Sequence, residues 1–531
     1  MKKTLTLIIA LCLVITMFSG CSDKGEVVTD VGTLTKEEIK VINANAGGLK
    51  LPFDDKGTEI TIFTGTDNTG LSDSPVVKEL SRRTGLKITI LEVPKSTMQE
   101  KMQVLIASKD TMPDIGGGSN INVINDLGQQ GAYVNILEYQ DEIPNFKKIF
   151  IDEARERGTE KVTKSWLASN GALYQFPSYD KNRDVNHGML YRKDIFDKHG
   201  LKMWNSPEEF YEILKQLKTL YPDASPFVSK TGTQFFTQNA ASWGVQNWPG
   251  ISYNFDSGNW TYAGLQPKFK EFLEFVKKLY DEGLIDKEFI TCTQSAWTQK
   301  MTQAAKGFVT FDWIGRLDQF VNQSTVEGYD LRYANPMGPE QKVITLPKAL
   351  GGTCIKNSEK SIYALKLMDY LLSDGGNELI NIGIEGVTFE WNEDKTKAKY
   401  LLAEGETLDE NTLEAKWGIS IPSLTLRADR RGWQFQFTER EQEAQDLMLN
   451  KENGGFLPEQ PELSYTSEEM EIINEHDVQL RKISEEFATK YILSDKSTQA
   501  DWDKYLKDMK AAGLDEVVKC HNDAQARYNK K

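Results

Sequence analysis

The first part of the chain alternates between segments with a two-residue apolar period and segments with a helical apolar period. Residues 59–63 and 87–93 alternate polar and apolar side chains and predict two strands. Between them, residues 74–85 predict a helix that Ser and Pro begin, Val and Leu line on one face, and Gly ends. Residues 98–106 predict a second helix, and residues 113–115 a third, short strand. This order predicts a parallel sheet covered by helices on both faces.

The same kind of pattern restarts further along the chain. Residues 189–191 predict a strand, and residues 206–209 form a capping-box pattern at the start of a helix with one apolar face. A helix over 267–283 and a buried strand at 307–311 follow. From about residue 438 onward the pattern is mainly helical. The chain is therefore predicted to form a second α/β unit with a helical C-terminal part.

The N-terminal residues predict an export signal over residues 1–20. Two lysines precede an apolar run at residues 5–18, which is shorter than the roughly 20 residues that span a bilayer. The run ends in two small residues and Cys21, which resembles the lipobox of bacterial lipoproteins. That resemblance implies a lipid anchor on Cys21, which would tether the protein to the outer face of the cell membrane. Ordinary secretion with cleavage nearby is the alternative, and residues 21–56 are otherwise predicted to be a flexible linker.

Composition and charge exclude several classes of protein. The 531 residues are 39% apolar and 10% aromatic, which is enough for two or three hydrophobic cores. No second apolar run is long enough to span a membrane. The net charge of −15 and the absence of a block of five or more basic residues argue against nucleic acid as a partner.

The sequence contains none of the common catalytic or metal-binding motifs. There is no His-Glu-x-x-His, no Gly-x-Ser-x-Gly, no phosphate loop and no Cys-x-x-Cys, so we predict no cofactor and no metal. After Cys21, three cysteines remain, an odd number without close spacing, which argues against a disulfide scaffold. At most one bridge could form among Cys292, Cys354 and Cys520, and the pattern leaves the pair open.

Several short motifs, taken in order, resemble the family 1 extracellular solute-binding proteins of ABC importers. The resemblance is greatest to the long lipoprotein branch of the carbohydrate-uptake group, and is distant to maltose-binding protein. It spans most of residues 57–531. The motifs are Ala107-Ser-Lys-Asp-Thr-Met-Pro-Asp-Ile115, Gly171-Ala-Leu-Tyr-Gln-Phe-Pro177, Leu190-Tyr-Arg-Lys-Asp-Ile-Phe196, Ser206-Pro-Glu-Glu-Phe210 and Gly383-Ile-Glu-Gly386.

The resemblance implies a type II periplasmic-binding-protein fold, with two α/β lobes joined by three crossings. One lobe would comprise residues 57–180 plus 350–418, and the other residues 181–349 plus 419–531. It also implies a monomer that closes over a carbohydrate of oligosaccharide size and delivers it to the permease of an ABC importer. Some members bind calcium in a loop that matches residues 219–227, but this chain has one carboxylate there, so we predict no calcium site.

Polar residues after the strands of the first unit are the first candidates for ligand contact, because ligands bind outside the carboxyl ends of strands in such sheets. Asp67 falls at the place of an acid that binds sugar hydroxyls in the maltose-binding relative, and Asn68 lies beside it. Ser119 follows three glycines after the next strand. The alternatives are an Asx-turn at Asp67 and a plain turn at the glycines.

Tryptophans are the second group of candidates, because an indole face fits the C–H patch of a pyranose. The resemblance places Trp313 and Trp433 like sugar-stacking tryptophans of the maltose-binding relative. Trp243 and Trp248 lie in a polar loop, and core packing is the alternative for each indole. Three weaker polar candidates are Tyr179, Asp312 and Arg316.

Two other functions remain open from sequence. Carboxylates and tryptophans also line the clefts of secreted glycoside hydrolases and lyases. A binding protein for a peptide or another non-sugar solute, or one that serves a sensor kinase, would also fit the pattern.

Overall fold

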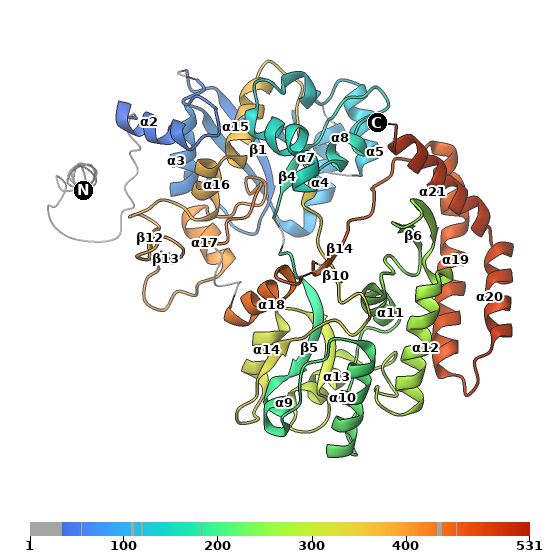
Figure 1. Cartoon of the computed structure of the whole chain (residues 1–531). Helices are drawn as coiled ribbons and strands as arrows, with labels where there is room; N and C mark the ends of the chain where they lie inside the picture. Colours follow the sequence, from blue (N-terminus) through green and yellow to red (C-terminus); the bar gives the residue numbers. More distant parts are fainter. Residues whose placement is uncertain are drawn as a thin grey trace.

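The protein has two α/β lobes, one above the other in Figure 1, with a row of C-terminal helices along one side. The computed structural model describes residues 34–54, 56–107, 111–117, 120–181, 183–432, 438–452 and 454–530. The predicted signal segment and Cys21 therefore lie outside the described residues, as do Ser119 and Trp433. The predicted α/β fold with a helical C-terminal part is confirmed.

The sheet of the first lobe is mixed. Its order is β2-β1-β3-β11-β4, and β1 pairs in parallel with both β2 and β3. β11 runs antiparallel to β3 and β4, because the chain re-enters this sheet from the second lobe. The predicted purely parallel sheet is therefore wrong at this edge. The strands are β1 (Glu59–Gly65), β2 (Lys87–Val93), β3 (Ile115–Gly116), β4 (Phe176–Tyr179) and β11 (Ala349–Ile355).

Helices cover this sheet and have the apolar faces that the sequence predicted. In α3 (Pro75–Thr84), Val76, Val77 and Leu80 are completely buried, and Gly85 ends the helix with a φ of 75°. Ser74 occupies the N-cap position, but its hydroxyl donates to the carbonyl of Leu71 instead of capping the helix. The other helices of the lobe are α2 (Lys36–Ala44), α4 (Met98–Ala107), α5 (Ile121–Gln129), α8 (Lys161–Lys164), α15 (Ser361–Leu372), α16 (Asp374–Asn381) and α17 (Glu410–Trp417).

The second lobe contains a three-stranded antiparallel sheet, β8-β5-β9. The predicted strands and helices are present, with the capping box of α10 only half formed. The Ser206 hydroxyl accepts the Glu209 N–H, while the Glu209 carboxylate accepts the N–H of Asn205. The elements are β5 (His187–Arg192), β8 (Val309–Trp313), β9 (Leu331–Tyr333), α9 (Lys193–His199), α10 (Pro207–Leu220), α12 (Pro267–Asp281), α13 (Gln294–Thr302) and α14 (Arg316–Gln323).

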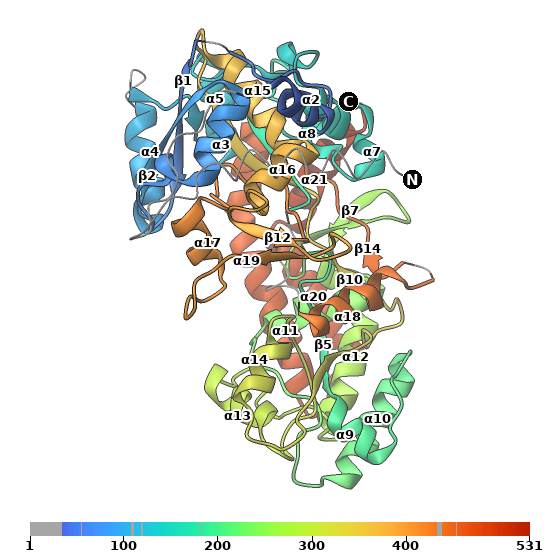
Figure 2. The ribbon, with the colours of Figure 1, turned by 90° about the vertical axis from the view of Figure 1, so that its left-hand side faces the viewer.

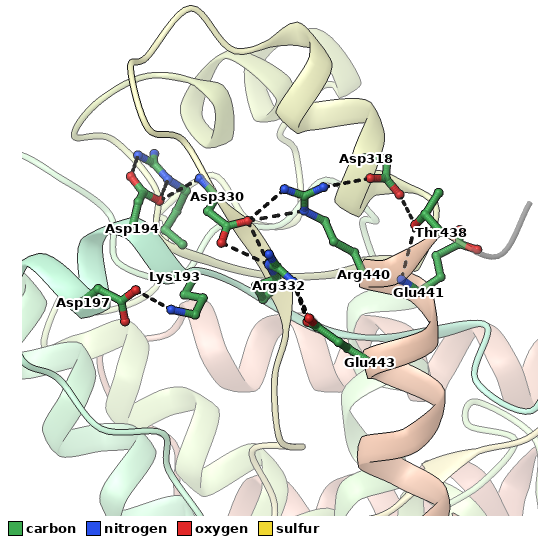
Figure 3. A network of polar contacts seen from close by, with 11 residues as sticks. Lys193, Asp194, Asp197, Asp318, Asp330, Arg332, Thr438, Arg440, Glu441 and Glu443 are labelled. Atoms are coloured by element: carbon green, nitrogen blue, oxygen red, sulfur yellow. Dashed lines mark hydrogen bonds and ion pairs between the residues drawn. The ribbon is translucent and has the colours of Figure 1, made fainter. Parts of the chain in front are cut away.

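The C-terminal part is helical as predicted, and its first helix is fixed to the second lobe by ion pairs (Figure 3). Arg440 bridges Asp318 and Asp330, and Arg332 holds Glu443 at 2.6 Å. The helices are α18 (Glu439–Leu449), α19 (Ser467–Leu493), α20 (Gln499–Ala511) and α21 (Leu514–Tyr528). α19 packs between α12 and α21.

Each of the two lobes has a hydrophobic core of its own. One large core draws on residues 46–176 and 349–426, and another on residues 189–337 and 480–517. A smaller cluster adds Ala444 and Met448 of α18 to the second lobe. Each lobe can therefore move largely as a rigid body, because close-packed cores resist deformation.

The predicted linker is ordered in its second half, which corrects the expectation for residues 21–56. Helix α2 begins with a complete capping box, and Ala46, Leu49 and Leu51 are buried in the core of the first lobe. The Asn43 side chain exchanges two hydrogen bonds with the backbone of Leu51. The polar composition concealed these few apolar residues, which are enough to anchor the segment.

Three chain crossings join the lobes, and one carboxylate connects all three. The crossings run from β4 to β5, from β10 (Val343–Ile344) to β11, and from α17 to α18. Asp184 of the first crossing lies 2.6 Å from the Lys348 ammonium of the second and 3.1 Å from the Arg430 guanidinium of the third. Burial alone would raise the pKa of Asp184, but Lys348 and Arg430 hold it below its ordinary value.

A further contact between the lobes comes from the segment after β14 (Phe456–Leu457). Glu459 pairs with Lys161 at 2.7 Å, and the Glu462 carboxylate accepts the Trp166 indole N–H at 3.1 Å. Lys164 lies over the ring of Tyr528 at the end of α21, beside α8 (Figure 1). The C-terminal part thus touches the first lobe without a covalent crossing.

Two features of the described residues complete the fold. None of their helices is long and apolar enough to cross a membrane. Cys292, Cys354 and Cys520 are buried and free, so the described cysteines form no disulfide.

Replacing Asp184 by Asn should destabilise the protein at pH 7 and not at low pH. Breaking a fully buried pair costs about 3–5 kcal/mol, and the partial exposure of Lys348 and Arg430 reduces this to about 1–2 kcal/mol. Because the folded pKa is lowered, the stabilisation exists above the unfolded pKa and is lost as pH falls through the folded value. Thermal denaturation at pH 7 and pH 3 measures the difference. Asp197→Asn, which removes an exposed pair with Lys193, is the control.

Candidate functional site

The ends of β1 and β8 lie at the boundary between the lobes. β5 receives the chain from the first crossing, so its first residue, His187, lies at that boundary, and its pairing partner is Trp313 at the end of β8. In Figure 2, α17 of the first lobe and α14 of the second lie on the same side of the molecule. α17 contacts the loop after β1, and α14 begins three residues after Trp313. The candidate residues of both lobes therefore lie on the same side of the lobe boundary, a region that we call the opening.

Trp313 is the exposed aromatic residue of this opening, with 41% of its surface accessible. Its indole lies over Gly315, where an added Cβ would come within 2.3 Å of the ring. A side chain at position 315 would therefore displace the indole. Because glycine has no side chain, the ring can rest on the turn with one face toward solvent, as a stacking platform requires.

Asp312 is a buried anchor beside this platform. It is 4% exposed, and its carboxylate accepts the backbone N–H of Trp313 at 2.6 Å. The Lys230 ammonium lies 2.7 Å from the carboxylate, and the Arg316 Nε lies 3.5 Å from it. Both cations also lie over the ring of Trp297, at 4.7 and 5.6 Å. Asp312 and Arg316 thus lie next to each other, and the Asp312 carboxylate is occupied by protein partners, so their predicted ligand contacts stay predictions.

Lys230 is the residue that sequence reasoning missed. It follows an extended segment in which Phe227 bridges in parallel to Val309 of β8, so it ends beside Asp312. The only local signal is a short apolar pair followed by Ser229 and Lys230. The pairing with β8 depends on residues some 80 positions away, which no local pattern contains.

His187, the pairing partner of Trp313, is a neutral group at the lobe boundary. Burial lowers the pKa of its imidazole, although the charge of Asp312 acts in the opposite direction. Its Nδ1 lies 3.0 Å from the Asn186 side-chain nitrogen. Since the ordinary pKa of His is about 6.5, a lowered value leaves this ring uncharged at pH 7.

In the first lobe, Asp67 and Asn68 have different surroundings. Asp67 is exposed in the loop after β1. Asn68 donates to the Glu414 carboxylate at 2.9 Å and to the Asn411 side chain at 3.3 Å, which ties the loop to α17. The turn itself is closed by the Thr66 hydroxyl, which accepts the Asn68 N–H. The Asp67 carboxylate is therefore the acceptor that this loop leaves open to solvent.

Trp243 and Trp248 are core residues, which corrects the prediction that their polar loop presents them to a ligand. They are 3% and 2% exposed. Trp243 packs on Phe272 and Phe275, and Trp248 stacks on Phe269 with 17° between the rings. Ser242 and Gln246 of this loop are buried as well and donate to the carbonyls of Asn239 and Pro458, so the loop is part of the core that the indoles fill.

Tyr179 is half-buried at the end of β4. Its ring meets Phe150 edge-on, its hydroxyl accepts a hydrogen bond from Arg157, and its backbone N–H donates to Leu426. These contacts tie it to the first lobe and to the approach of the third crossing. Ser119 and Trp433 lie outside the described residues, so their predicted contacts stay predictions.

A cavity of about 680 Å³ lies away from this opening, between α2, α16 and residues 427–431. Arginines and acids line it in similar numbers, and several are paired, as in Arg427 with Asp374 and Arg431 with Glu378. We therefore base the candidate site on the lobe boundary, where Trp313 of the second lobe and Asp67 of the first are exposed. Among the described residues, no group of three or more His, Cys, Asp or Glu could hold a metal ion.

Comparison with known proteins identifies the family. The profile of the bacterial extracellular solute-binding proteins matches residues 66–378, more than half of the chain. The chain belongs to this family. The resemblance predicted from sequence is thereby confirmed, and the bacterial extracellular solute-binding proteins bind their solutes and are not enzymes.

Two relatives and one structure illustrate the relationship. Lipoprotein LipO of Bacillus subtilis (strain 168) is 25% identical over 379 residues, which are 66% of this chain and 70% of that protein. Polygalacturonan/rhamnogalacturonan-binding protein YtcQ of the same strain is 22% identical over 477 residues, 84% and 87% of the two chains. An HMO-binding, ABC-transporter-associated solute-binding protein from Bifidobacterium longum infantis ATCC 15697 has a TM-score of 0.64 and 18% identity, over 90% of this chain and 100% of that one. The structural likeness shows that this member of the family shares the fold.

Replacing Gly315 by Ala should move the Trp313 indole without unfolding the protein. The backbone angles of Gly315, φ −62° and ψ −10°, suit alanine, so we expect a stability change below about 1 kcal/mol. The difference in fluorescence emission between the chain and its Trp313→Leu variant isolates this indole, and Gly315→Ala should change that difference. In the Trp313→Leu background the same substitution should have no spectral effect. An unchanged difference spectrum would contradict the contact.

Proposed function

We propose that this protein captures a carbohydrate, an oligosaccharide, between its lobes and delivers it to the permease of an ABC importer. The observation that supports this best is the exposed indole of Trp313, which rests on Gly315 at the lobe boundary. Two similar proteins have carbohydrate ligands: YtcQ is a polygalacturonan- and rhamnogalacturonan-binding protein, and the Bifidobacterium protein binds HMO. Membership in a solute-binding family leaves the sugar open and favours capture over cleavage.

The two sides of the opening offer complementary chemistry for a sugar. An indole face that covers roughly 100 Å² of C–H surface contributes about 2.5 kcal/mol at 25 cal/mol per Å². The open carboxylate of Asp67 can accept charge-assisted hydrogen bonds from neighbouring hydroxyls. Trp313 and the proposed Trp433 would supply two such platforms, and hydrogen bonds would add to them against the cost of association. Trp433 and Ser119 are proposed as further contacts.

Lobe closure is the proposed mechanism. Asp67 belongs to the first lobe and Trp313 to the second, so a solute that touches both stabilises the closed arrangement. The short crossings provide the hinge, and the separate cores let each lobe move as a body. The permease would then recognise the closed form, which couples delivery to occupancy.

The location follows from the family and from the N-terminal residues. The family is extracellular, and LipO is a lipoprotein. We propose that Cys21 holds the lipid anchor and that the protein acts as a monomer at the outer face of the cell membrane. A peptide or another non-sugar solute is the competing ligand, and it is an outcome of the test below.

Thermal denaturation of the full chain in detergent, against neutral oligosaccharides, acidic oligosaccharides and peptides, tests the function. A ligand that binds only the folded state adds about 2.7 kcal/mol at 100 times its dissociation constant, which raises the midpoint. We expect a rise with one class of oligosaccharide and no release of reducing ends. A rise with peptides alone would replace the sugar by a peptide, and released reducing ends would contradict a binding protein.

Replacing Trp313 by Ala should weaken binding of the oligosaccharide by about 2 kcal/mol, roughly thirtyfold, because the stacking face is lost. Isothermal titration calorimetry measures the dissociation constant. Trp243→Phe, a core substitution in the same lobe, is the control and should change stability more than affinity. Equal affinities of the Trp313→Ala variant and the unmodified chain would remove Trp313 from the site.

A further inference from the structure

The group beside Trp313 contains more positive than negative charge. Two cations, Lys230 and Arg316, share the single carboxylate of Asp312, and the three side chains are 16%, 19% and 5% exposed. In the part of the chain that the structure describes, no other carboxylate lies within ion-pair distance of either cation. His187, at the lobe boundary, does not change this balance, because its imidazole is neutral at pH 7. One positive charge is therefore left without a carboxylate in a largely buried position, and the ring of Trp297 is the other group that both cations face.

Nearby acids do not supply the missing charge. Asp318 lies on the same helix as Arg316, but it pairs with Arg440 and accepts from the Thr438 hydroxyl (Figure 3). Gln319 accepts one hydrogen bond from Arg316 and is uncharged. An uncompensated buried charge costs several kcal/mol, which an anion from outside would offset.

The donors of the same group are also incompletely used. Arg316 Nε and Asp312 Oδ2 are both buried, and neither has a hydrogen-bond partner among the described residues, so the two groups do not satisfy each other. The Lys230 ammonium has three N–H donors, and its ion pair with Asp312 involves one side of the ammonium. Buried donors without acceptors cost about 1–3 kcal/mol each, so the arrangement favours a ligand that supplies acceptor oxygens.

We infer that the solute is an acidic oligosaccharide, whose sugar carboxylate is bound by Lys230 and Arg316 while its ring lies against Trp313. This inference rests on the proposed function and names the substrate class of the same site. A carboxylate offers two oxygens to the planar guanidinium and one charge to the ammonium, which matches both the unused donors and the excess charge. Asp67, in the opposite lobe, then binds hydroxyls.

A half-buried lysine of the first crossing supports the same conclusion. Lys181 makes no hydrogen bond or ion pair with another described residue, and burial lowers its pKa. The nearest acid that affects it is Glu410 at the start of α17, the helix that also holds Asn68. A second positive group thus lies in the first crossing between the lobes, in a chain whose overall charge is −15.

The first test compares each acidic oligosaccharide with its own methyl ester, so that the sugar, its linkage and its length stay the same and only the charge is removed. Isothermal titration calorimetry of the full chain with galacturonate, glucuronate and mannuronate oligomers should show one acid that binds at least tenfold more tightly than its ester. Neutral oligosaccharides or esters that bind as tightly as every acid would overturn the inference and leave the proposed function intact. Absence of binding by all saccharides would overturn both.

The second test assigns the effect to the cation. Lys230→Gln should weaken binding of the acid about tenfold or more and leave binding of the ester nearly unchanged, and Lys230→Arg should restore most of the affinity. Lys215→Gln, on the exposed surface of α10, is the matched control. An equal loss for acid and ester would mean that Lys230 only supports Asp312, which contradicts carboxylate binding by this residue. Circular dichroism of each variant checks the fold.

Discussion

The carboxylate of Asp184 is the interaction on which the arrangement of the two lobes depends. It joins the first crossing to Lys348 of the second and to Arg430 of the third, in a position from which water is largely excluded. Each lobe has its own core, so the relative positions of the two bodies are set by this cluster together with the contact of Glu459 and Glu462 with α8. A charged cluster suits a hinge, because ion pairs tolerate changes of angle better than interlocked apolar side chains do.

Local order along the chain could be predicted from sequence to a large extent. The helix at 75–84 and the helix at 267–281 have the predicted apolar faces, because their periodicity reports directly on the side that packs against the sheet. The order of sheet strands was less accessible. β11 enters the first sheet antiparallel after an excursion of more than 160 residues through the other lobe, and no local pattern records that return. The ordered segment before residue 56 was missed because three apolar residues were hidden in a polar composition.

The candidate site was only partly predictable, for a related reason. Trp313 and Asp312 lie at the end of a recognisable strand, so their position at the boundary followed from the fold. Trp243 and Trp248 were misplaced because polar neighbours in sequence do not decide which way an indole points, and the space between α11 (Gln234–Ala240) and α12 does. Lys230 could not be found, because its role exists only once residues 227–230 lie beside β8. Stacking platforms were thus easier to infer than the charges around them.

The contact of Glu459 and Glu462 with α8 has a consequence for how lobe motion can be observed. Points joined by hydrogen bonds and ion pairs of about 3 Å can shift by only fractions of an ångström before those contacts break. Tyr528, which packs on Lys164 beside them, therefore lies close to the pivot. The arc travelled by any atom grows with its distance from that pivot. A probe at the end of α21 would therefore report little, while one on α10, at the end of the second lobe away from α8, would move further (Figures 1 and 2).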